Sequence, residues 1–431
     1  MMEHRGESET GDYVSIHIKE DSLVSSIKEK MEDVAISACI SKVPDEFRSG
    51  NYEKTYIPDK VSIGPFHHGK PGLKDMEDQK WRYLFALLNR KQNLEASLDR
   101  CVELLRKLEH RARRCYSENI DLTSDEFVQI MLVDGCFIIE LFLKFTFKSL
   151  RRRNDIVFST PGMRFELRRN MVLLENQIPY FVLQRLFEIV PIPKLCSLSL
   201  NELAFRFFRV IIPAGDKQVL WEKFNVEGTH LLDLMHHCFA PSYPTVQSKG
   251  GRQQRLDSAT RLQEAGIRFK KATTRSLLDV KFVNGVLEIP PLEVDEWTET
   301  ILGNLIALEQ LHSDDTQHIT SYAFLFSNLL LSKKDVKLLS KQRILIYDKE
   351  KEKEVSELFR KLSSDWKVKD VYYKGLFEQA KENKRTSVHL RWQKLKHNRL
   401  SLLVYVLVIL ILLVTVVGAF FSVLSFCLHH I

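Results

Sequence analysis

Apolar residues recur every three or four positions along much of this chain, which is the spacing of amphipathic helices. In the stretch 76–90, for example, Trp81, Leu84, Phe85 and Leu88 share one face. The same spacing predicts helices at 94–115, 127–148, 171–190, 201–210, 229–238, 259–265, 298–311, 322–332 and around 355–362. The pattern therefore predicts a mainly α fold.

One pair of segments shows a β pattern instead. Residues 278–282 and 286–290 flank Asn284-Gly285, a dipeptide that tight hairpin turns favour. No internal repeat is visible along the chain. We therefore expect a single large helical domain with a small β-hairpin.

The longest apolar stretch lies near the end of the sequence. No residue from 400 to 428 carries a charge, and 402–421 is interrupted only by Thr415 and Gly418. Twenty helical residues extend about 30 Å, the thickness of the hydrocarbon layer of a bilayer. Core helices of soluble proteins rarely run this long without a polar face. We therefore predict a transmembrane helix at 400–428, with the membrane lipid bilayer as a partner.

The charges around this segment predict its orientation. Only His429, His430 and Ile431 follow the uncharged run, and the polar N-terminus has no signal-peptide core. An excess of Lys and Arg marks the cytoplasmic flank of a span. We expect a single-pass tail anchor in the plasma membrane or an endomembrane, with the bulk of the chain in the cytosol. The basic flank consists of Arg385, Arg391, Lys394, Lys396 and Arg399.

A second apolar stretch, 130–147, is a poorer candidate for a span. It contains Asp134, Glu140 and Lys144. Each ionisable residue near the bilayer centre costs about 2.5–3.5 kcal/mol on insertion scales. We expect a helix buried in the soluble core instead.

The composition agrees with a globular protein that carries one membrane segment. Charged residues make up 28% and hydrophobic ones 44%, with few helix breakers, 17 Gly and 13 Pro. We divide the chain into a polar N-terminal lead-in at 1–33, a helical cytosolic domain at 34–395 and the transmembrane helix at 400–428. The seven cysteines include no C-x-x-C pair. They argue against a disulfide framework and a tetrathiolate zinc site, and they fit a reducing cytosol.

One loop has the spacing of a phosphate-binding motif. Residues 64–70 (GPFHHGK) match G-x-x-x-x-G-K, but Pro71 follows where the motif requires Ser or Thr. His67 and His68 are adjacent, so on an extended loop they point in opposite directions and cannot chelate one metal together. We interpret this segment as a stiff structural loop.

Other polar residues have structural interpretations too. Cys136 lies in the apolar stretch 130–147, where burial raises a thiol pKa, so we expect an inert core cysteine. Asn176 and Gln177 are expected to satisfy backbone groups at the start of a helix. Within 236–238 (HHC), a residue could ligate a metal only with a distant partner.

Two basic clusters could contact anionic lipid in a chain whose net charge is +7. Residues 144–169 hold eight Lys and Arg against two acidic residues, and 247–271 hold seven against two. A solvated positive surface is the alternative interpretation. No nucleic-acid recognition motif accompanies the clusters, so we expect no nucleic-acid partner.

Two hypotheses of different class remain for the function. We favour a membrane-tethered interaction protein that is not an enzyme, because no complete catalytic motif is present. The alternative is an enzyme that uses a loop around His67-His68, with Asp134 or Glu175 nearby, whose side chains must then converge on one open pocket. We assign no catalytic, cofactor-binding or metal residues. For a protein partner we favour the polar loop 241–257, with an insertion that binds nothing as the alternative.

Five blocks of the sequence resemble a plant family called domain of unknown function 247, of the UPF0481 type. The resemblance spans about 36–428 in the expected order, and it implies a plant origin, a mainly helical domain and a membrane anchor. Some relatives act in grass self-incompatibility, which suggests recognition or signalling. The family supplies no catalytic residues to transfer. The blocks are 56–58 (YIP) with 61–69 (VSIGPFHHG), 131–140 (MLVDGCFIIE), 174–181 (LENQIPYF), 265–270 (AGIRFK) and 304–310 (NLIALEQ).

Overall fold

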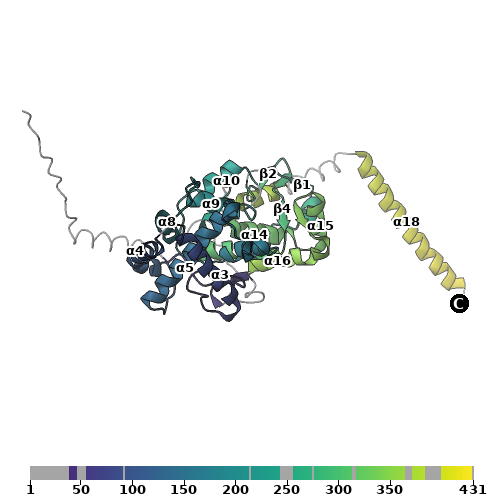
Figure 1. Ribbon diagram of the computed structural model, residues 1–431. Helices are drawn as coiled ribbons and strands as arrows, with labels where there is room; N and C mark the ends of the chain where they lie inside the picture. The colour runs from purple at the N-terminus through teal and green to yellow at the C-terminus, as the bar shows by residue number, and fades with distance from the viewer. Residues whose placement is uncertain are drawn as a thin grey trace, which may run out of the picture.

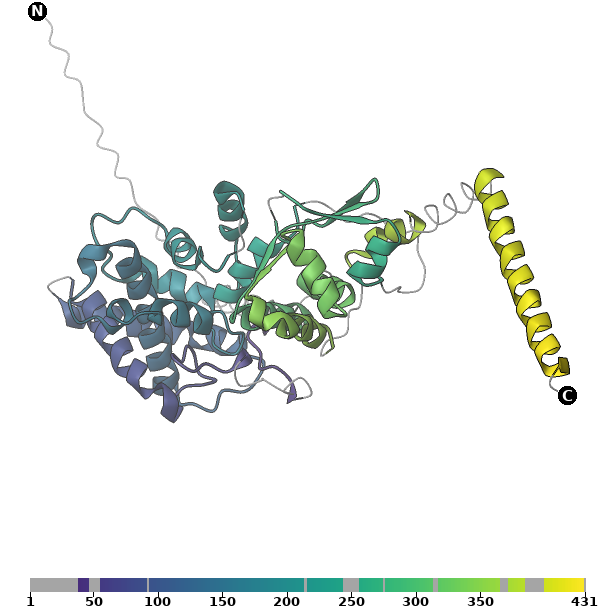
Figure 2. The same cartoon turned by 90° about the vertical axis from the view of Figure 1, so that its right-hand side faces the viewer.

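A body of packed helices with a small sheet makes up most of the molecule, and one long helix stands apart from it (Figures 1 and 2). This arrangement confirms the mainly α fold with a hairpin and a separate apolar helix near the C-terminus. The computed structural model describes residues 38–45, 55–90, 93–212, 215–242, 256–273, 276–312, 317–364, 371–383 and 399–429. The predicted lead-in at 1–33 lies outside these residues.

The N-terminal half packs around α5, Ser124–Thr146. Thr123 caps this helix in a capping box with Glu126, and nearly all residues from Phe127 to Lys144 are buried. The stretch 130–147 is therefore a core helix, as predicted. The other helices of this half are α3 (Lys74–Leu88), α4 (Leu94–Arg114), α6 (Ile156–Ser159), α7 (Met163–Met171), α8 (Tyr180–Ile189), α9 (Leu200–Phe208), α10 (Lys217–Phe224) and α11 (Leu231–Phe239).

The C-terminal half combines helices with two small sheets. In the first, β3 (Val286–Ile289) pairs with β2 (Lys281–Val283) antiparallel and with β1 (Arg268–Lys271) parallel. Asn284 and Gly285 both have positive φ, +50° and +73°, as the tight hairpin turn requires. The second sheet pairs β4 (Leu292–Val294) with β5 (Leu345–Tyr347). The helices here include α12 (Ala259–Glu264), α13 (Thr298–His312), α14 (His318–Leu329), α15 (Lys333–Lys341) and α16 (Glu352–Ser364).

The predicted helix at 171–190 is wrong over its first half. The chain ends α7 at Met171, passes through a buried turn and starts α8 only at Tyr180. Pro179 directly precedes α8, and proline both lacks an N–H and disfavours helical geometry in the residue before it. The side chains of the turn also bond to the backbone, as described below.

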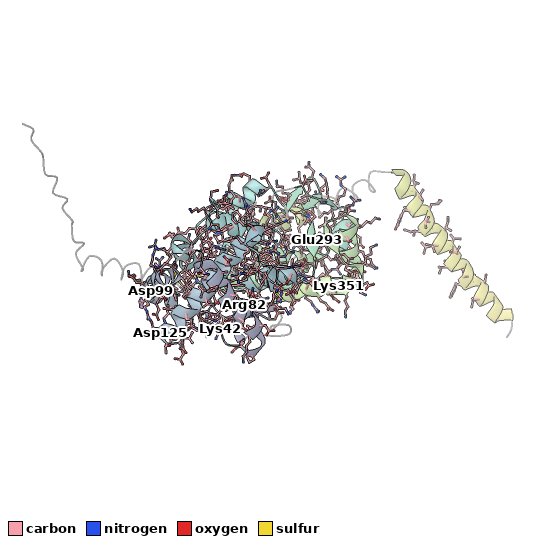
Figure 3. All side chains as sticks on the ribbon, viewed as in Figure 1. Lys42, Arg82, Asp99, Asp125, Glu293 and Lys351 are labelled. Atoms are coloured by element: carbon pink, nitrogen blue, oxygen red, sulfur yellow. The ribbon has the colours of Figure 1, made fainter. Side chains whose placement is uncertain are left out.

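The separate helix is α18, Arg399–His429. Its segment Leu403–Val423 has a mean hydropathy of 3.1 and no buried residue. Figure 3 shows side chains of α18 projecting on both sides of the helix. Among the described helices, α18 is long and apolar enough to cross a membrane. Most of its predicted basic flank, at 385–396, lies outside the described residues.

Candidate functional site

A buried ion pair holds the loop 61–70 against α5. Asp134 accepts hydrogen bonds from Lys80 Nζ at 2.5 Å and from the backbone N–H of Gly64 at 2.7 Å. Lys80 also donates to the Ser62 carbonyl at 2.9 Å, and its side chain is fully buried. Burial alone lowers the pKa of Lys80, but Asp134 and then Glu77 hold that pKa above its ordinary value. Burial raises the pKa of Asp134, and the charge of Lys80 opposes that rise. The hydrogen bonds of the pair fix the loop to the core.

The two adjacent histidines have different surroundings. His67 is buried, and its Nε2 lies 3.1 Å from Glu175 Oε2. Glu175 Oε1 accepts the backbone N–H of Val43 at 2.9 Å, so this carboxylate ties two chain segments together. His68 is exposed to solvent. Of the side chains in the enzyme hypothesis, His67 and Glu175 therefore meet in the interior, whereas His68 points to solvent and does not join them.

Three amide side chains, one in the last turn of α7 and two in the turn after it, bond to backbone groups of residues 59–63 and of the turn itself. Asn170 Oδ1 accepts the N–H groups of Asp59 and Lys60, both at 3.0 Å. Asn176 Oδ1 accepts the N–H of Ile63 at 2.7 Å. Gln177 Nε2 donates to the carbonyls of Met171 and Leu173, at 2.8 and 2.7 Å. The amides replace the backbone partners that a sheet would supply, which confirms the structural role predicted for Asn176 and Gln177.

Gly64 allows the loop and the turn to approach closely. Its φ is +78°, a conformation that L side chains rarely adopt. A Cβ atom built there would overlap the carbonyl oxygen of Gln177, which also accepts a hydrogen bond from Tyr116 at 3.1 Å. Glycine at position 64 thus lets the backbone of the loop pack directly against the backbone of the turn. We therefore interpret 64–70 as a structural loop.

The later family block on α13 continues the same network. Asn304 accepts the N–H of Leu174 at 2.8 Å and donates to the Thr55 carbonyl at 2.8 Å. On the next turn, Glu309 accepts the N–H groups of Ile319 and Thr320. All five resembling blocks therefore contribute polar side chains or backbone to buried hydrogen bonds that hold the fold, the block 265–270 through the N–H of Ile267.

The other candidates for chemistry are also structural. Cys136 is fully buried, and burial raises the pKa of its thiol well above the ordinary value, as predicted. His236 Nε2 lies 3.0 Å from Glu309 Oε1. Within the part of the chain that the structure describes, no three His, Cys, Asp or Glu side chains gather as a metal site would require.

Much of the basic cluster at 144–169 is internal. Lys144 pairs with buried Asp155 at 2.8 Å, and Arg168 donates to the Phe207 carbonyl at 2.6 Å. Arg169 pairs with Glu166 at 2.8 Å. The predicted positive surface is therefore smaller than the sequence indicates, and it is reduced to the exposed Lys148, Arg152, Arg153 and Arg164. In the second cluster, residues 247–255 lie outside the described residues, whereas Arg261, Arg268, Lys270 and Lys271 are described and exposed.

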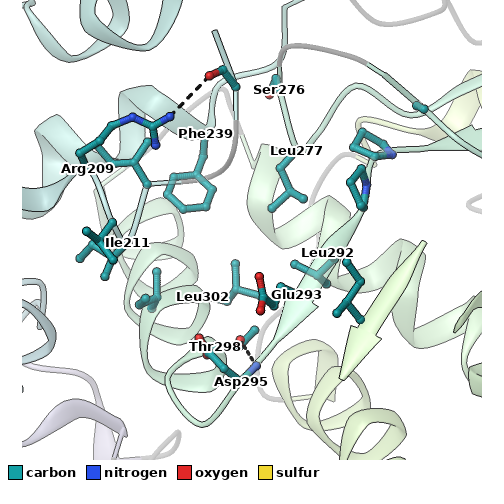
Figure 4. Close-up of a pocket in the computed structure, with 18 of the residues that line it drawn as sticks. Arg209, Ile211, Phe239, Ser276, Leu277, Leu292, Glu293, Asp295, Thr298 and Leu302 are labelled. Atoms are coloured by element: carbon teal, nitrogen blue, oxygen red, sulfur yellow. Dashed lines mark hydrogen bonds between the residues drawn. The ribbon is translucent and has the colours of Figure 1, made fainter. Parts of the chain in front are cut away.

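A cavity of about 960 Å³ lies between the two halves of the body (Figure 4). It is larger than the two others that we describe, of about 410 and 190 Å³. Its walls combine apolar and polar side chains, and its size suits a bound molecule or side chains of a partner. None of the residues of the enzyme hypothesis lines it. The side chains around it include Ile211, Phe239, Leu277 and Leu302, with charged Arg209, Glu293 and Asp295.

Comparison with known proteins places this architecture in a family. The model of a family described as "Plant protein of unknown function" matches residues 40–418. A UPF0481 protein of Arabidopsis thaliana is 31% identical over 388 residues, which cover 84% of this chain and 80% of the relative. A putative UPF0481 protein of the same plant is 24% identical over 465 residues, covering 86% and 85%. No solved structure matches the chain. The chain therefore belongs to the plant family called domain of unknown function 247.

Proposed function

We propose that this protein is a membrane-tethered protein of plant recognition or signalling, which binds a protein partner and catalyses no reaction. The observation that carries the proposal is the exposure of α18. Leu403, Tyr405, Val414 and Phe420 are each more than 60% exposed in a segment without a single charge. A soluble protein rarely leaves so large an apolar surface in water, and a lipid bilayer covers it without cost.

The charges beside α18 support one orientation. Five basic residues lie within fifteen positions of residue 400 on the side of the helical body. Such an excess marks the cytosolic flank of a span, and each basic residue near an anionic leaflet adds about 1 kcal/mol of attraction. The body of the protein then faces the cytosol.

Deletion of residues 399–429 is expected to release the protein from membranes. The full chain should stay in the membrane pellet after washing with alkaline carbonate, because α18 is held by lipid and not by surface charge. The deleted chain should move to the supernatant, whereas a chain with α18 replaced by an unrelated apolar helix of equal length should stay. A deleted chain that stays in the pellet would contradict the tether.

The cavity lies where the predicted partner loop leaves the body. Phe239 lines the cavity, and the carbonyl of the next residue, Ala240, accepts hydrogen bonds from Lys223 and Ser276. Ser242 N–H donates to Asp279 at 2.7 Å. Residues 243–255 of the loop lie outside the described residues. We place the partner site on this loop together with the cavity beside its first anchored residues.

A pull-down with the detergent-solubilised chain tests this placement. Replacing 242–256 by Gly and Ser, or Val210→Asp at the cavity wall, is expected to remove the same partner. Val210 is 67% exposed, so its substitution changes the surface and not the core. Leu195→Asp is the matched control, because Leu195 is 89% exposed and lines none of the three cavities described. An unchanged set of partners in both test variants would contradict the site.

A further inference from the structure

Two cysteines from distant parts of the chain lie side by side. The N–H groups of Cys39 and Ile40 both donate to the carbonyl of Cys115 at 2.9 Å, and Ile40 pairs with Tyr116 in a parallel bridge. Paired chain segments lie about 4.8 Å apart. Disulfides join Cα atoms that are about 4.4–6.8 Å apart, so the backbone separation suits a disulfide.

The backbone bonds place the two cysteines next to each other. Cys39 and Cys115 directly precede the bridged residues Ile40 and Tyr116, and the Cys39 N–H itself donates to the Cys115 carbonyl. Both are free cysteines in this structure, and each thiol influences the pKa of the other.

Accessibility and charge distinguish this pair from the other cysteines. Cys39 is partly exposed, which gives a small oxidant access, whereas Cys115 is buried. The hydrogen bond from Cys39, followed by the charge of Arg111, holds the pKa of Cys115 below its ordinary value, which favours the reactive thiolate. By contrast, Cys101 and Cys136 are neighbours on α4 and α5 that are both fully buried, and burial raises the pKa of both thiols.

We propose that Cys39 and Cys115 are a redox modification site, which closes to a disulfide when the protein meets a peroxide. The thiolate of one cysteine of the pair attacks a peroxide oxygen, which gives a sulfenic acid and releases hydroxide. The sulfur of the other cysteine then attacks the sulfenic sulfur and loses its proton, and hydroxide leaves as the S–S bond forms. In total, two thiols lose two electrons and one peroxide is reduced to water.

The disulfide would join the first described segment, 38–45, covalently to the end of α4. That segment already carries the N–H of Val43, which bonds to Glu175 in the buried network. A reducing cytosol keeps the pair as thiols, and an oxidising episode closes it. This site does not depend on the membrane tether or on the partner site.

Mass spectrometry of the full-length chain in detergent tests the site. The protein is treated with hydrogen peroxide, alkylated with iodoacetamide and digested with protease. We expect a linked pair of peptides that contains Cys39 and Cys115, about 2 Da lighter than the two thiol peptides together, and that separates with dithiothreitol. Because this readout uses the unsubstituted chain, it does not depend on how well a variant folds.

Two variants complete the test. Cys39→Ser should abolish the link and leave Cys115 alkylated or oxidised further. Cys196→Ser is the matched control, since Cys196 is also partly exposed but its thiol contacts the Leu198 carbonyl, and this variant should keep the link. Complete alkylation of Cys39 and Cys115 after peroxide would overturn the proposal, and so would a link from Cys39 to any other cysteine.

Discussion

Replacing Asp134 by alanine is expected to lower the free energy of unfolding by about 3–5 kcal/mol. The substitution leaves the fully buried Lys80 without its closest carboxylate, and it removes the acceptor of the Gly64 N–H. Among the described residues, Lys80 then keeps only Glu77, at 2.6 Å, as its carboxylate partner, and the buried Gly64 N–H loses its acceptor. Breaking a buried set of bonds in this way costs more than the complete set contributes. Urea unfolding of the detergent-solubilised chain, followed by tryptophan fluorescence, measures the change.

Asp125→Ala on the same helix is the matched control. Asp125 pairs with Arg106 at 2.6 Å, but its side chain is 80% exposed at the surface (Figure 3). Exposed pairs contribute little because water and salt screen them. We therefore expect nearly unchanged unfolding. Equal effects of the two substitutions would contradict the structural role of Asp134.

Gly64→Ala is the second substitution with a large expected effect. A residue with a side chain costs roughly 1–2 kcal/mol at positive φ. The added Cβ would also overlap the Gln177 carbonyl oxygen, and overpacking costs about 1–3 kcal/mol more. The total loss of unfolding free energy is then roughly 2–5 kcal/mol.

Gly69→Ala separates the two causes within the same loop. Gly69 has φ +77°, nearly that of Gly64, but a Cβ built on it meets no atom within 4 Å. We expect only the conformational cost, about 1–2 kcal/mol, in the same urea measurement. If Gly69→Ala destabilises the protein as much as Gly64→Ala, close packing of the loop against the turn is not the reason for glycine at position 64.

Sequence patterns predicted the elements whose signal is local. Apolar spacing predicted the helices at 76–90 and 94–115 to within two residues, and Asn284-Gly285 predicted the hairpin. The same reasoning missed α10 and α15, which are short. It also missed the parallel partners β1, β4 and β5, because partners distant in sequence leave no local pattern.

The buried polar network could be predicted only in part, for a physical reason. Asn176 was expected to bond to nearby backbone groups. Its partner Ile63, however, lies 113 residues earlier in the chain. The apolar spacing predicted a helix through 171–179, because the residues of this turn are as apolar and as buried as those on a helix face. In this turn, polar side chains bond to backbone groups that a helix would have paired with one another. Those partners become visible only in the folded structure.

Protease protection tests most directly whether α18 tethers the protein to a membrane. A chain tagged at its N-terminus and after Ile431 is inserted into sealed microsomes and exposed to protease from the cytosolic side. The basic flank of α18 predicts that the N-terminal tag and the helical body are digested, whereas the C-terminal tag stays protected until detergent opens the membrane. Digestion of the C-terminal tag with the body protected would contradict the orientation, and digestion of both tags in sealed vesicles would contradict the span itself.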